Sequence, residues 1–278
     1  MHSFLCYKYK KSGSSEGSGS SSGSDLVELG ILTKQISEFS NDDIGTEVSI
    51  PYNNEGSGIS GPIIFEVVGV NHHTSEEHPK TITLMTKNII RKAAFDAAEP
   101  DNPDSMRKDN GNNRWSVSNI RQWLNSDGAA GKWFTAQHEY DAPPTSGNVS
   151  SADGAYADAP GFLAGFSANV LQHFTDITNI TALCNADGGG SETTVDKVFL
   201  PSRTEMGYGK INGIAEGTHL SVKYPDIDSK IKNYQYYWMR STYDGSDTFT
   251  MSYINNAGRV FDELAYCGYG IAPIIVLH

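Results

Sequence analysis

The segment YQYYWMRSTYDGSDTFTMSYINNAGRVFDELAYCGYGIAPIIVLH, residues 234–278, says more about the fold than any other part of the chain. Seven of the 14 tyrosines lie between Tyr234 and Tyr269, among Asn, Ser, Asp and Gly, and the segment ends in an apolar run at 274–277. Tyrosine gives large, rigid contact area and small polar residues give adaptable hydrogen bonds, a mixture typical of binding loops. The segment therefore predicts a recognition surface carried on a buried final strand.

This C-terminal segment divides into residues expected to hold the fold and residues expected to contact a ligand. Trp238, Arg240 and the run 274–277 are predicted to be buried. A buried arginine needs a carboxylate partner, and Asp196 and Glu205 are the candidates. The candidate ligand-binding residues are the polar and aromatic positions Tyr243, Asp244, Asp247, Tyr253, Asn255, Asn256, Tyr266 and Tyr269.

Length, charge and hydropathy exclude several classes of protein. A chain of 278 residues can bury a full core. The net charge of −12, without a dense basic stretch, argues against a nucleic-acid-binding protein. No run approaches the ~20 apolar residues that a membrane-spanning helix requires, so no membrane span is expected.

The N-terminal residues differ in composition from the rest of the chain. Residues 1–11 are short, basic and partly aromatic, and residues 12–24 form a Gly/Ser tether that cannot build a core. We interpret 1–11 as an anchoring peptide joined by the flexible linker 12–24 to a displayed domain. An expression scar and plain disorder are the alternatives.

Residues 25–278 are expected to form one globular domain with a β-rich N-terminal subregion at 26–92. Alternating apolar residues with Gly and Pro between them predict short antiparallel strands. The expected strands are 47–50, 62–70, 81–86, 177–183, 195–200, 236–241, 249–254 and 271–277.

Two helices are expected beside these strands, which makes the predicted fold class α+β. Apolar residues at helical spacing predict the first over 116–125, with Ser116 as its N-cap. The second is expected over 161–174. Residues 97–113 and 201–235 are expected to be irregular, and the long polar excursion 133–160 is a loop of a length that is usually functional or well packed.

No stretch carries a recognisable catalytic or metal motif. The run NHHTSEEHP, residues 71–79, does not have HExxH spacing and is interpreted as a solvated turn. The glycines 188–190 lack the lysine of a phosphate loop, and no GxSxG occurs. We therefore expect no enzyme, no cofactor and no metal. Calcium binding is the one metal alternative, with Asp244, Asp247, Asp262 and Glu263 as its ligands.

The cysteines Cys6, Cys184 and Cys267 are far apart and odd in number. Without a CxxC pair they predict neither a zinc site nor a redox motif. Three free thiols are the main interpretation, and a disulfide between Cys184 and Cys267 is the alternative.

Several motifs occur in an order that resembles a known family. They are Trp115-Ser116 through Ile120-Arg121 and Trp123-Leu124-Asn125, DKVFL at 196–200 with Ser202 and Glu205, YWMRS at 237–241, then Gly258 and GIAP at 270–273. This order resembles an uncharacterised domain family of tailed phages and prophages of Firmicutes and gut bacteria, over residues 27–278. The predicted structural core accordingly includes Trp115, Trp123, Asp196, Trp238 and Arg240.

The resemblance implies a C-type-lectin-like fold, similar to phage tropism determinants and formylglycine-generating proteins. Trp238 and Arg240 would then be core residues, and positions 243–269 would be displayed. Tyr237 stands where the family pattern often has Trp. Ile271-Ala272-Pro273 stand where the pattern commonly has Val-Arg-Pro. This chain therefore lacks the arginine of the pattern, and no charged role is transferred to Ala272. The cysteine-based oxidation of the formylglycine enzymes is not transferred either.

Together these features predict a virion structural protein that displays a receptor- or carbohydrate-binding domain at the virion surface, in a tail fibre, a baseplate or a head decoration. The expected partners are other virion proteins, through residues 1–11, and a host cell-surface glycan or protein. The oligomeric state is left open. The alternative is a purely structural virion or cell-surface protein whose Tyr-rich face packs on a neighbouring subunit. An enzyme of the formylglycine type is the third possibility.

Overall fold

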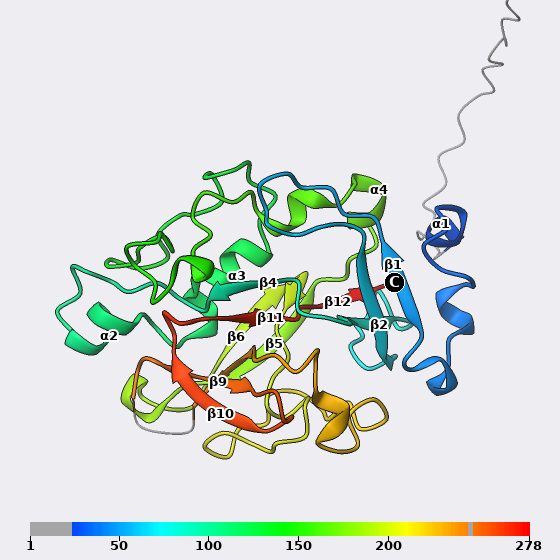
Figure 1. Ribbon diagram of the computed structural model, residues 1–278. Helices are drawn as coiled ribbons and strands as arrows, with labels where there is room; N and C mark the ends of the chain where they lie inside the picture. The colour runs from blue at the N-terminus through cyan, green and yellow to red at the C-terminus, as the bar shows by residue number, and fades with distance from the viewer. Residues whose placement is uncertain (1–23, 244–246) are drawn as a thin grey trace, which may run out of the picture.

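The computed structural model describes residues 24–243 and 247–278 (Figure 1). The expected anchoring peptide 1–11, nearly all of the linker 12–24, Cys6 and Asp244 lie outside the described residues. The first described element is a short helix, α1 (Ser24–Glu28), beside the first strand of the fold.

The central sheet has five antiparallel strands, and the last strand of the sequence lies inside it. Its order is β1 (Glu47–Ile50), β2 (Ile63–Val70), β3 (Ile82–Thr86), β12 (Ile274–Leu277) and β7 (Val198–Phe199). Ile274 of β12 faces Met85 on one side and Phe199 on the other. All four residues of β12 are buried, as the apolar run predicted.

The second sheet also has five strands and contains most of the Tyr-rich segment. Its order is β10 (Val260–Leu264), β9 (Thr250–Ile254), β8 (Tyr237–Thr242), β11 (Gly268–Ile271) and β4 (Arg91–Ala94). The β8–β11 pair is parallel, and the other pairs are antiparallel. Only Ala272 and Pro273 separate β11 from β12, so the chain passes directly from one sheet to the other.

A hairpin of β5 (Ile177–Ala182) and β6 (Ser191–Asp196) completes the strands. The remaining α-helices are α2 (Ser105–Asn110), α3 (Asn119–Leu124) and α4 (Ala168–Leu171). Single 3-10 turns lie at Ile36–Glu38, Asn41–Asp43, Trp115–Val117, Ala152–Gly154, Phe162–Gly165, Asn185–Asp187 and Asp228–Lys230. Short helices with several antiparallel sheets confirm the α+β class, and the finer likeness to C-type lectins stays a prediction.

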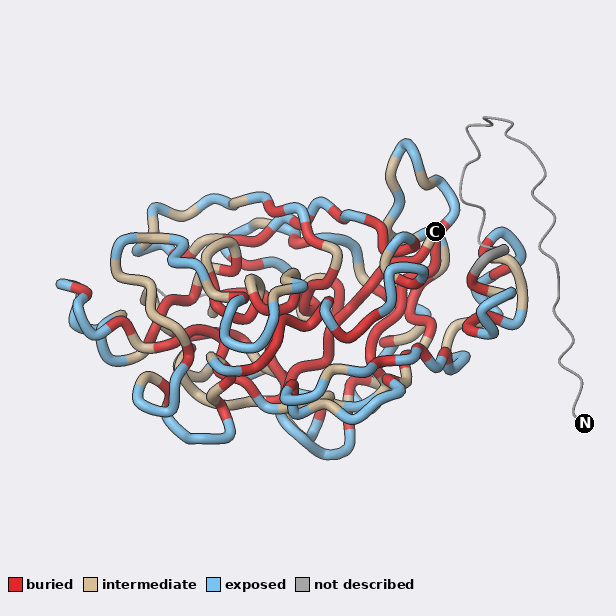
Figure 2. The backbone as a smooth tube through the Cα atoms, turned by 90° about the horizontal axis from the view of Figure 1, so that it is seen from above, coloured by how far each residue is buried: buried red, intermediate tan, exposed pale blue. Residues whose placement is uncertain are grey.

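One hydrophobic core cluster runs through the described residues, from Leu26 to Leu277. Figure 2 shows the buried backbone gathered along the middle of the molecule, with exposed loops around it. Phe95 links two tryptophans of this core, because its ring centroid lies 6.2 Å from those of both Trp115 and Trp238.

The structure corrects several expected boundaries. The first helix begins later than predicted, because Ser118 and not Ser116 is its N-cap, while Trp115–Val117 form a separate 3-10 turn. The second expected helix, 161–174, is broken into a 3-10 turn and α4. A glycine at 165 lies directly against the ring of Tyr52, and the backbone is extended immediately after it.

Four strands and two α-helices were missed from the sequence. Helix α1 lies where the expected linker 12–24 meets the expected β-rich subregion 26–92. Helix α2 lies within 97–113, which we expected to be irregular, and β4, β10, β11 and most of β6 were not predicted. These strands carry charged residues or glycines, so they lack the apolar alternation that marks a half-buried strand. Of these four strands, β10 and β4 form the two edges of the second sheet, β11 lies beside β4, and β6 is one strand of the hairpin.

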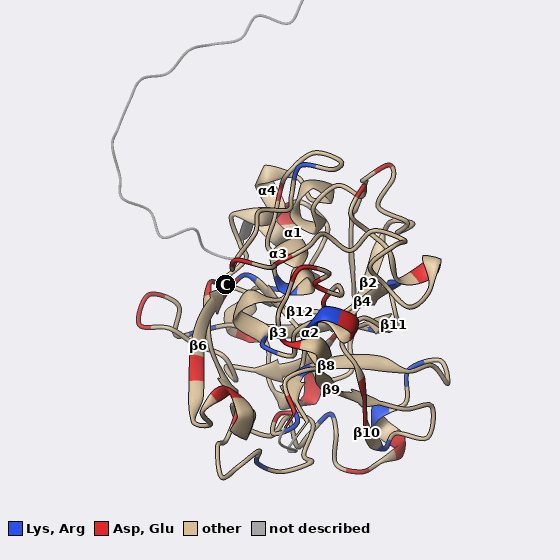
Figure 3. Cartoon of the chain, turned by 90° about the vertical axis from the view of Figure 1, so that its left-hand side faces the viewer, with Lys and Arg blue, Asp and Glu red and all other residues tan. Residues whose placement is uncertain are grey.

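The described residues contain no helix that is long and apolar enough to span a membrane. Their charges are dispersed: Figure 3 shows acidic and basic positions scattered along the loops, with both signs on α2. Acidic and basic residues are therefore mixed along the chain in that view.

Candidate functional site

Arg240 and Glu205 form an ion pair inside the core. Arg240, on β8, donates to both carboxylate oxygens of Glu205, at 2.7 and 2.9 Å, and to the carbonyls of Leu200 and Glu216. Burial alone would raise the pKa of Glu205, but the charge of Arg240 and hydrogen bonds from His73 and Arg240 hold it well below its ordinary value. Of the two partners predicted for Arg240, Glu205 is the one observed.

Asp196 is a second buried carboxylate, and its hydrogen-bond partners differ from those of Glu205. Its carboxylate accepts from the Trp115 Nε1–H at 3.1 Å, the Arg121 Nε–H at 2.6 Å, the Asn179 amide at 3.0 Å and the Thr194 hydroxyl at 2.6 Å. The motif residues Trp115, Arg121 and Asp196, far apart in the sequence, are thus joined in space.

Trp123 and Asn125 form hydrogen bonds that connect the C-terminal end of helix α3 with residues 160, 197 and 198. The Trp123 Nε1–H donates to the Pro160 carbonyl at 2.8 Å. The Asn125 side chain accepts from the backbone N–H groups of Lys197 and Val198 and donates to the Val198 carbonyl. All five residues expected in the core are fully buried, with relative exposures of 0 or 1% for Trp115, Trp123, Asp196, Trp238 and Arg240.

An aromatic cluster lies over Trp238 on the second sheet. The ring centroid of Tyr269 is 4.8 Å from that of Trp238 and 4.7 Å from that of Tyr253. Tyr236 adds a ring 5.6 Å from Tyr269, and Phe261 stacks on Tyr253 at 6.2 Å. The Trp238 Nε1–H donates to the Ala93 carbonyl at 2.9 Å, which fixes the base of the cluster.

The outer rings of this cluster are open to solvent. Phe261 is 48% exposed, Tyr236 41% and Tyr234, two residues before it, 78%. We call Tyr234, Tyr236, Tyr253, Phe261 and Tyr269 the aromatic surface. It borders a groove of about 550 Å³ that is lined by Lys92, Tyr234, Gln235, Tyr236, Asn256, Gly268, Tyr269 and Gly270.

The structure brings together some of the predicted ligand-binding residues and separates others. Asn256 and Tyr269 line the groove, and Tyr253 packs beside Tyr269. Tyr243 and Tyr266 are half-buried and do not line it. The structure does not describe Asp244.

Two other predicted ligand-binding residues use their oxygens within their own turns. The Asp247 carboxylate accepts from the backbone N–H groups of residues 249 and 250 and from the Thr250 hydroxyl. The Asn255 side-chain oxygen accepts from the N–H groups of Ala257 and Arg259. Both side chains therefore stabilise the turns at either end of β9, which shapes the aromatic surface without lining its groove.

The hydroxyl groups of Tyr253 and Tyr269 are protonated at neutral pH and can form hydrogen bonds. Burial raises the pKa of Tyr253 and Tyr269, and the Tyr269 hydroxyl donates to Glu263 at 3.0 Å. Both phenols therefore stay protonated. Lys92, at the rim, forms an exposed salt bridge with Asp153 at 2.7 Å.

No group of three or more His, Cys, Asp or Glu residues suited to a metal ion occurs in residues 24–243 and 247–278. The histidine-rich segment 71–79 is a turn between β2 and β3, as predicted, yet His73 is not a solvated residue. Its Nε2 lies 3.2 Å from Glu205 and its Nδ1 lies 3.1 Å from the Thr83 hydroxyl. Cys184 and Cys267 are free cysteines, so the alternative of a disulfide between them is wrong.

Sequence reasoning missed five side chains of this site: Lys92, Tyr234, Gln235, Tyr236 and Phe261. The two tyrosines belong to the Tyr-rich run, and their density was the available signal. Phe261 faces Tyr253 across the β9–β10 pair, and Lys92 comes from a strand that the sequence did not predict. The local sequence around Phe261 and Lys92 gives no signal that these residues belong to the site, because their placement depends on strand register.

Comparisons with known proteins place the chain in a family. A family model described as a domain of unknown function, DUF6273, matches residues 80–278, from just before β3 to the end of the sequence. This is shorter than the stretch 27–278 that the motifs suggested, and it leaves β1 and β2 outside. No curated protein and no solved structure matches the chain. The family match covers most of the sequence, and the chain therefore belongs to the DUF6273 family.

Proposed function

We propose that this protein displays a carbohydrate-binding domain whose binding site is the aromatic surface and its groove. The observation that carries the proposal is an exposed set of aromatic rings held on a rigid sheet beside a groove. Aromatic faces pack against the C–H faces of sugars, and polar groups at the rim bond the hydroxyls. Asn256, Gln235 and Lys92 supply such groups here.

Rigidity supports this assignment. Tyr253 and Tyr269 rest on Trp238, which is fully buried and bonded to Ala93. Rings that are already ordered lose little entropy when a ligand binds, and preorganisation of this kind strengthens binding. The exposed rings Tyr234 and Tyr236 would then make the outer contacts.

The wider proposal is a virion protein of a tailed phage, in a tail fibre, a baseplate or a head decoration, that binds a host cell-surface glycan or protein. It is supported by the ordered motifs and by their resemblance to phage and prophage proteins. A C-type-lectin-like fold and an anchoring role for residues 1–11 belong to the same proposal.

The second candidate is a subunit-packing surface. β10 is the last strand of its sheet, and it carries Phe261 with about half of its side chain exposed. An edge strand with an exposed aromatic residue also suits pairing with a neighbouring protein. The two candidates predict different ligands for the same rings.

The test uses the double variant Tyr234→Ala/Tyr236→Ala, because both side chains are exposed and their loss leaves the core intact. The full chain is labelled and applied to a glycan array and to host cells. Both rings line the groove, and truncating an aromatic contact in a binding site costs on the order of 1 kcal/mol or more, so the double variant should bind at least tenfold more weakly. The half-buried Tyr140→Ala, in the loop 133–160, is the matched control and should bind normally.

Absence of glycan and cell binding in the unaltered protein would contradict the proposal. If size-exclusion chromatography then showed an oligomer that the double variant dissociates, the aromatic surface would be a packing surface instead.

A further inference from the structure

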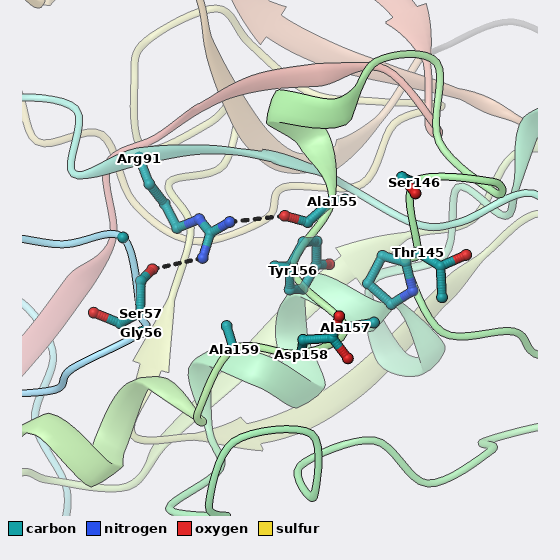
Figure 4. Close-up of a pocket in the computed structure, with 12 residues that line it drawn as sticks. Gly56, Ser57, Arg91, Thr145, Ser146, Ala155, Tyr156, Ala157, Asp158 and Ala159 are labelled. Carbon is teal, nitrogen blue, oxygen red and sulfur yellow. Dashed lines mark hydrogen bonds between the residues drawn. The ribbon is translucent and has the colours of Figure 1, made fainter.

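A second cavity lies on another part of the molecule, around Arg91. It has a volume of about 320 Å³, within the range of small-ligand sites, roughly 300–1,000 Å³. Its walls come from the loops 56–58 and 144–146, the segment 155–159 and the side chain of Arg91. Figure 4 shows the Arg91 guanidinium between Ser57 and Ala155, with Thr145 and Ser146 across the cavity.

Arg91 is a half-buried cation that has no carboxylate partner among residues 24–243 and 247–278. Its Nε donates to the Lys92 carbonyl at 3.0 Å, one terminal nitrogen to the Ser57 carbonyl at 2.6 Å and the other to the Ala155 carbonyl at 2.9 Å. No salt bridge joins it to any acidic residue in the described parts of the chain. Burial lowers its pKa from the ordinary value of arginine.

The guanidinium is also fixed in orientation. Its carbon lies 5.5 Å from the centroid of the Trp123 ring and 5.6 Å from that of the Tyr156 ring. Both rings are buried and anchored: Trp123 donates to the Pro160 carbonyl, and the Tyr156 hydroxyl donates to the Ala94 carbonyl. Arg91 therefore keeps its position without a counter-ion.

The loop that supplies the Ser57 carbonyl depends on two glycines. Gly56 and Gly58 have φ angles of 83° and 73°, which favour glycine over any residue with a side chain. These angles turn the Ser57 carbonyl toward Arg91. Residue 58 lies beside Arg91, since a Cβ there would be 3.9 Å from one of its terminal nitrogens.

Two donors of Arg91 remain for a ligand. A guanidinium has five N–H groups, and the three carbonyl contacts use one on Nε and one on each terminal nitrogen. One N–H on each terminal nitrogen is therefore left. Arginine binds carboxylate oxygens with two parallel hydrogen bonds, and a single carboxylate also neutralises its charge.

We propose that the Arg91 cavity binds a small molecule through one carboxylate group, carried either by a sugar acid or by a peptide C-terminus. The exposed hydroxyls of Thr145 and Ser146 are placed to bond the polar remainder of the ligand. Asp158 also lines the cavity, but it is exposed, and in Figure 4 its carboxylate points away from Arg91. Doubly charged phosphate esters fit less well, because one arginine cannot neutralise them.

The test titrates the full chain with D-glucuronate, N-acetyl-glycyl-glycine, the methyl ester of each, and inorganic phosphate, by isothermal titration calorimetry. We expect one of the two carboxylates to bind at a single site and its methyl ester not to bind. Binding of D-glucuronate would identify a sugar acid as the carrier of the carboxylate, and binding of N-acetyl-glycyl-glycine would identify a peptide C-terminus.

Two variants tie that binding to the cavity. Arg91→Lys keeps the charge but loses the paired donors, and should weaken binding roughly 10- to 100-fold, as expected for a charged hydrogen-bonded pair. Thr145→Trp fills the cavity from an exposed position and should abolish binding while leaving the fold intact. Lys108→Met, which removes a distant exposed charge on α2, is the control and should bind normally.

Three outcomes would overturn the proposal: no binding of either carboxylate, equal binding of the methyl ester, or binding unchanged in Thr145→Trp. Binding of inorganic phosphate alone would also overturn it. Because the aromatic surface is not altered in these variants, failure here is distinguishable from failure of the proposed glycan site.

Discussion

Replacing Arg240 by Met should destabilise the protein strongly, because it leaves the buried carboxylate of Glu205 without its counter-ion. Both side chains are about 1% exposed, and Arg240 makes four hydrogen bonds, two of them to Glu205. Removing one partner of a buried ion pair costs about 3–5 kcal/mol. For a domain of this size that loss lowers the melting temperature by roughly 6–20 °C.

The assay is urea unfolding followed by tryptophan fluorescence, since all four tryptophans are buried. The double variant Arg240→Met/Glu205→Gln completes a double-mutant cycle. It removes both charges, so it should lose less free energy of unfolding than the two single variants together. The difference measures the coupling between the two side chains.

The pH dependence gives a second, independent readout. The pKa of Glu205 is lowered in the folded state, so its contribution is present above its unfolded pKa of about 4.3 and is lost as the pH falls. In Arg240→Met, Glu205 loses the charge and hydrogen bonds of Arg240 and keeps those of His73 and Ser202, so burial raises its pKa relative to the unaltered protein and favours the protonated form. The stability difference between the unaltered protein and this variant should therefore be largest at neutral pH and shrink below about pH 4.

A destabilisation of less than about 1 kcal/mol at pH 7 would refute the reasoning, because no buried pair would then have been broken. A difference that does not change between pH 7 and pH 3 would refute it as well.

Three further predictions concern other buried groups. Trp238→Ala should cost about 3–5 kcal/mol, measured by urea unfolding, and a loss similar to that of the exposed Tyr236→Ala would show that Trp238 is not a core residue. Burial lowers the pKa of Lys232 to about 8, so the free energy of unfolding should rise between pH 8 and about 10.4, where only the unfolded state stays protonated. Lys232→Met should remove that rise, and parallel pH profiles for the two proteins would contradict the assignment. Asp196→Asn should lower the free energy of unfolding by about 2 kcal/mol, since Arg121 then lacks its carboxylate partner. Thermal melts measure this loss, and a change below about 0.5 kcal/mol would contradict the stabilising role of the Asp196 carboxylate.

The sequence predicted the parts of the fold that are encoded locally. The apolar run 274–277 forms a buried strand because uninterrupted apolar residues have no stable place at the surface. The segment around Trp238 was also predicted as a strand and is buried, although it contains Arg240, a serine and a threonine. Glu205 was one of the two carboxylates predicted as a partner of Arg240, with Asp196 as the other, for an equally general reason, the cost of an unpaired buried charge.

The arrangement of the candidate site depends on strand register, which the sequence does not reveal. Tyr253 meets Phe261 and Tyr269 only because β9 pairs with β10 and because β11 joins β8 in parallel. Tyr243 belongs to the same Tyr-rich segment, yet it lies directly after β8 and does not line the groove. Local composition thus indicated a recognition segment but could not tell which of its tyrosines are grouped.

The placement of β12 sets the order in which the protein can mature on the ribosome. β1, β2 and β3 are synthesised early and can pair as a meander, yet the free edge of β3 has to wait for residues 274–277, the last of the sheet to emerge. Until then the nascent chain presents an unpaired apolar strand edge, the kind of surface that promotes association between chains. Slow synthesis or crowded polysomes should therefore expose this protein to aggregation through the edge of β3 that β12 later covers.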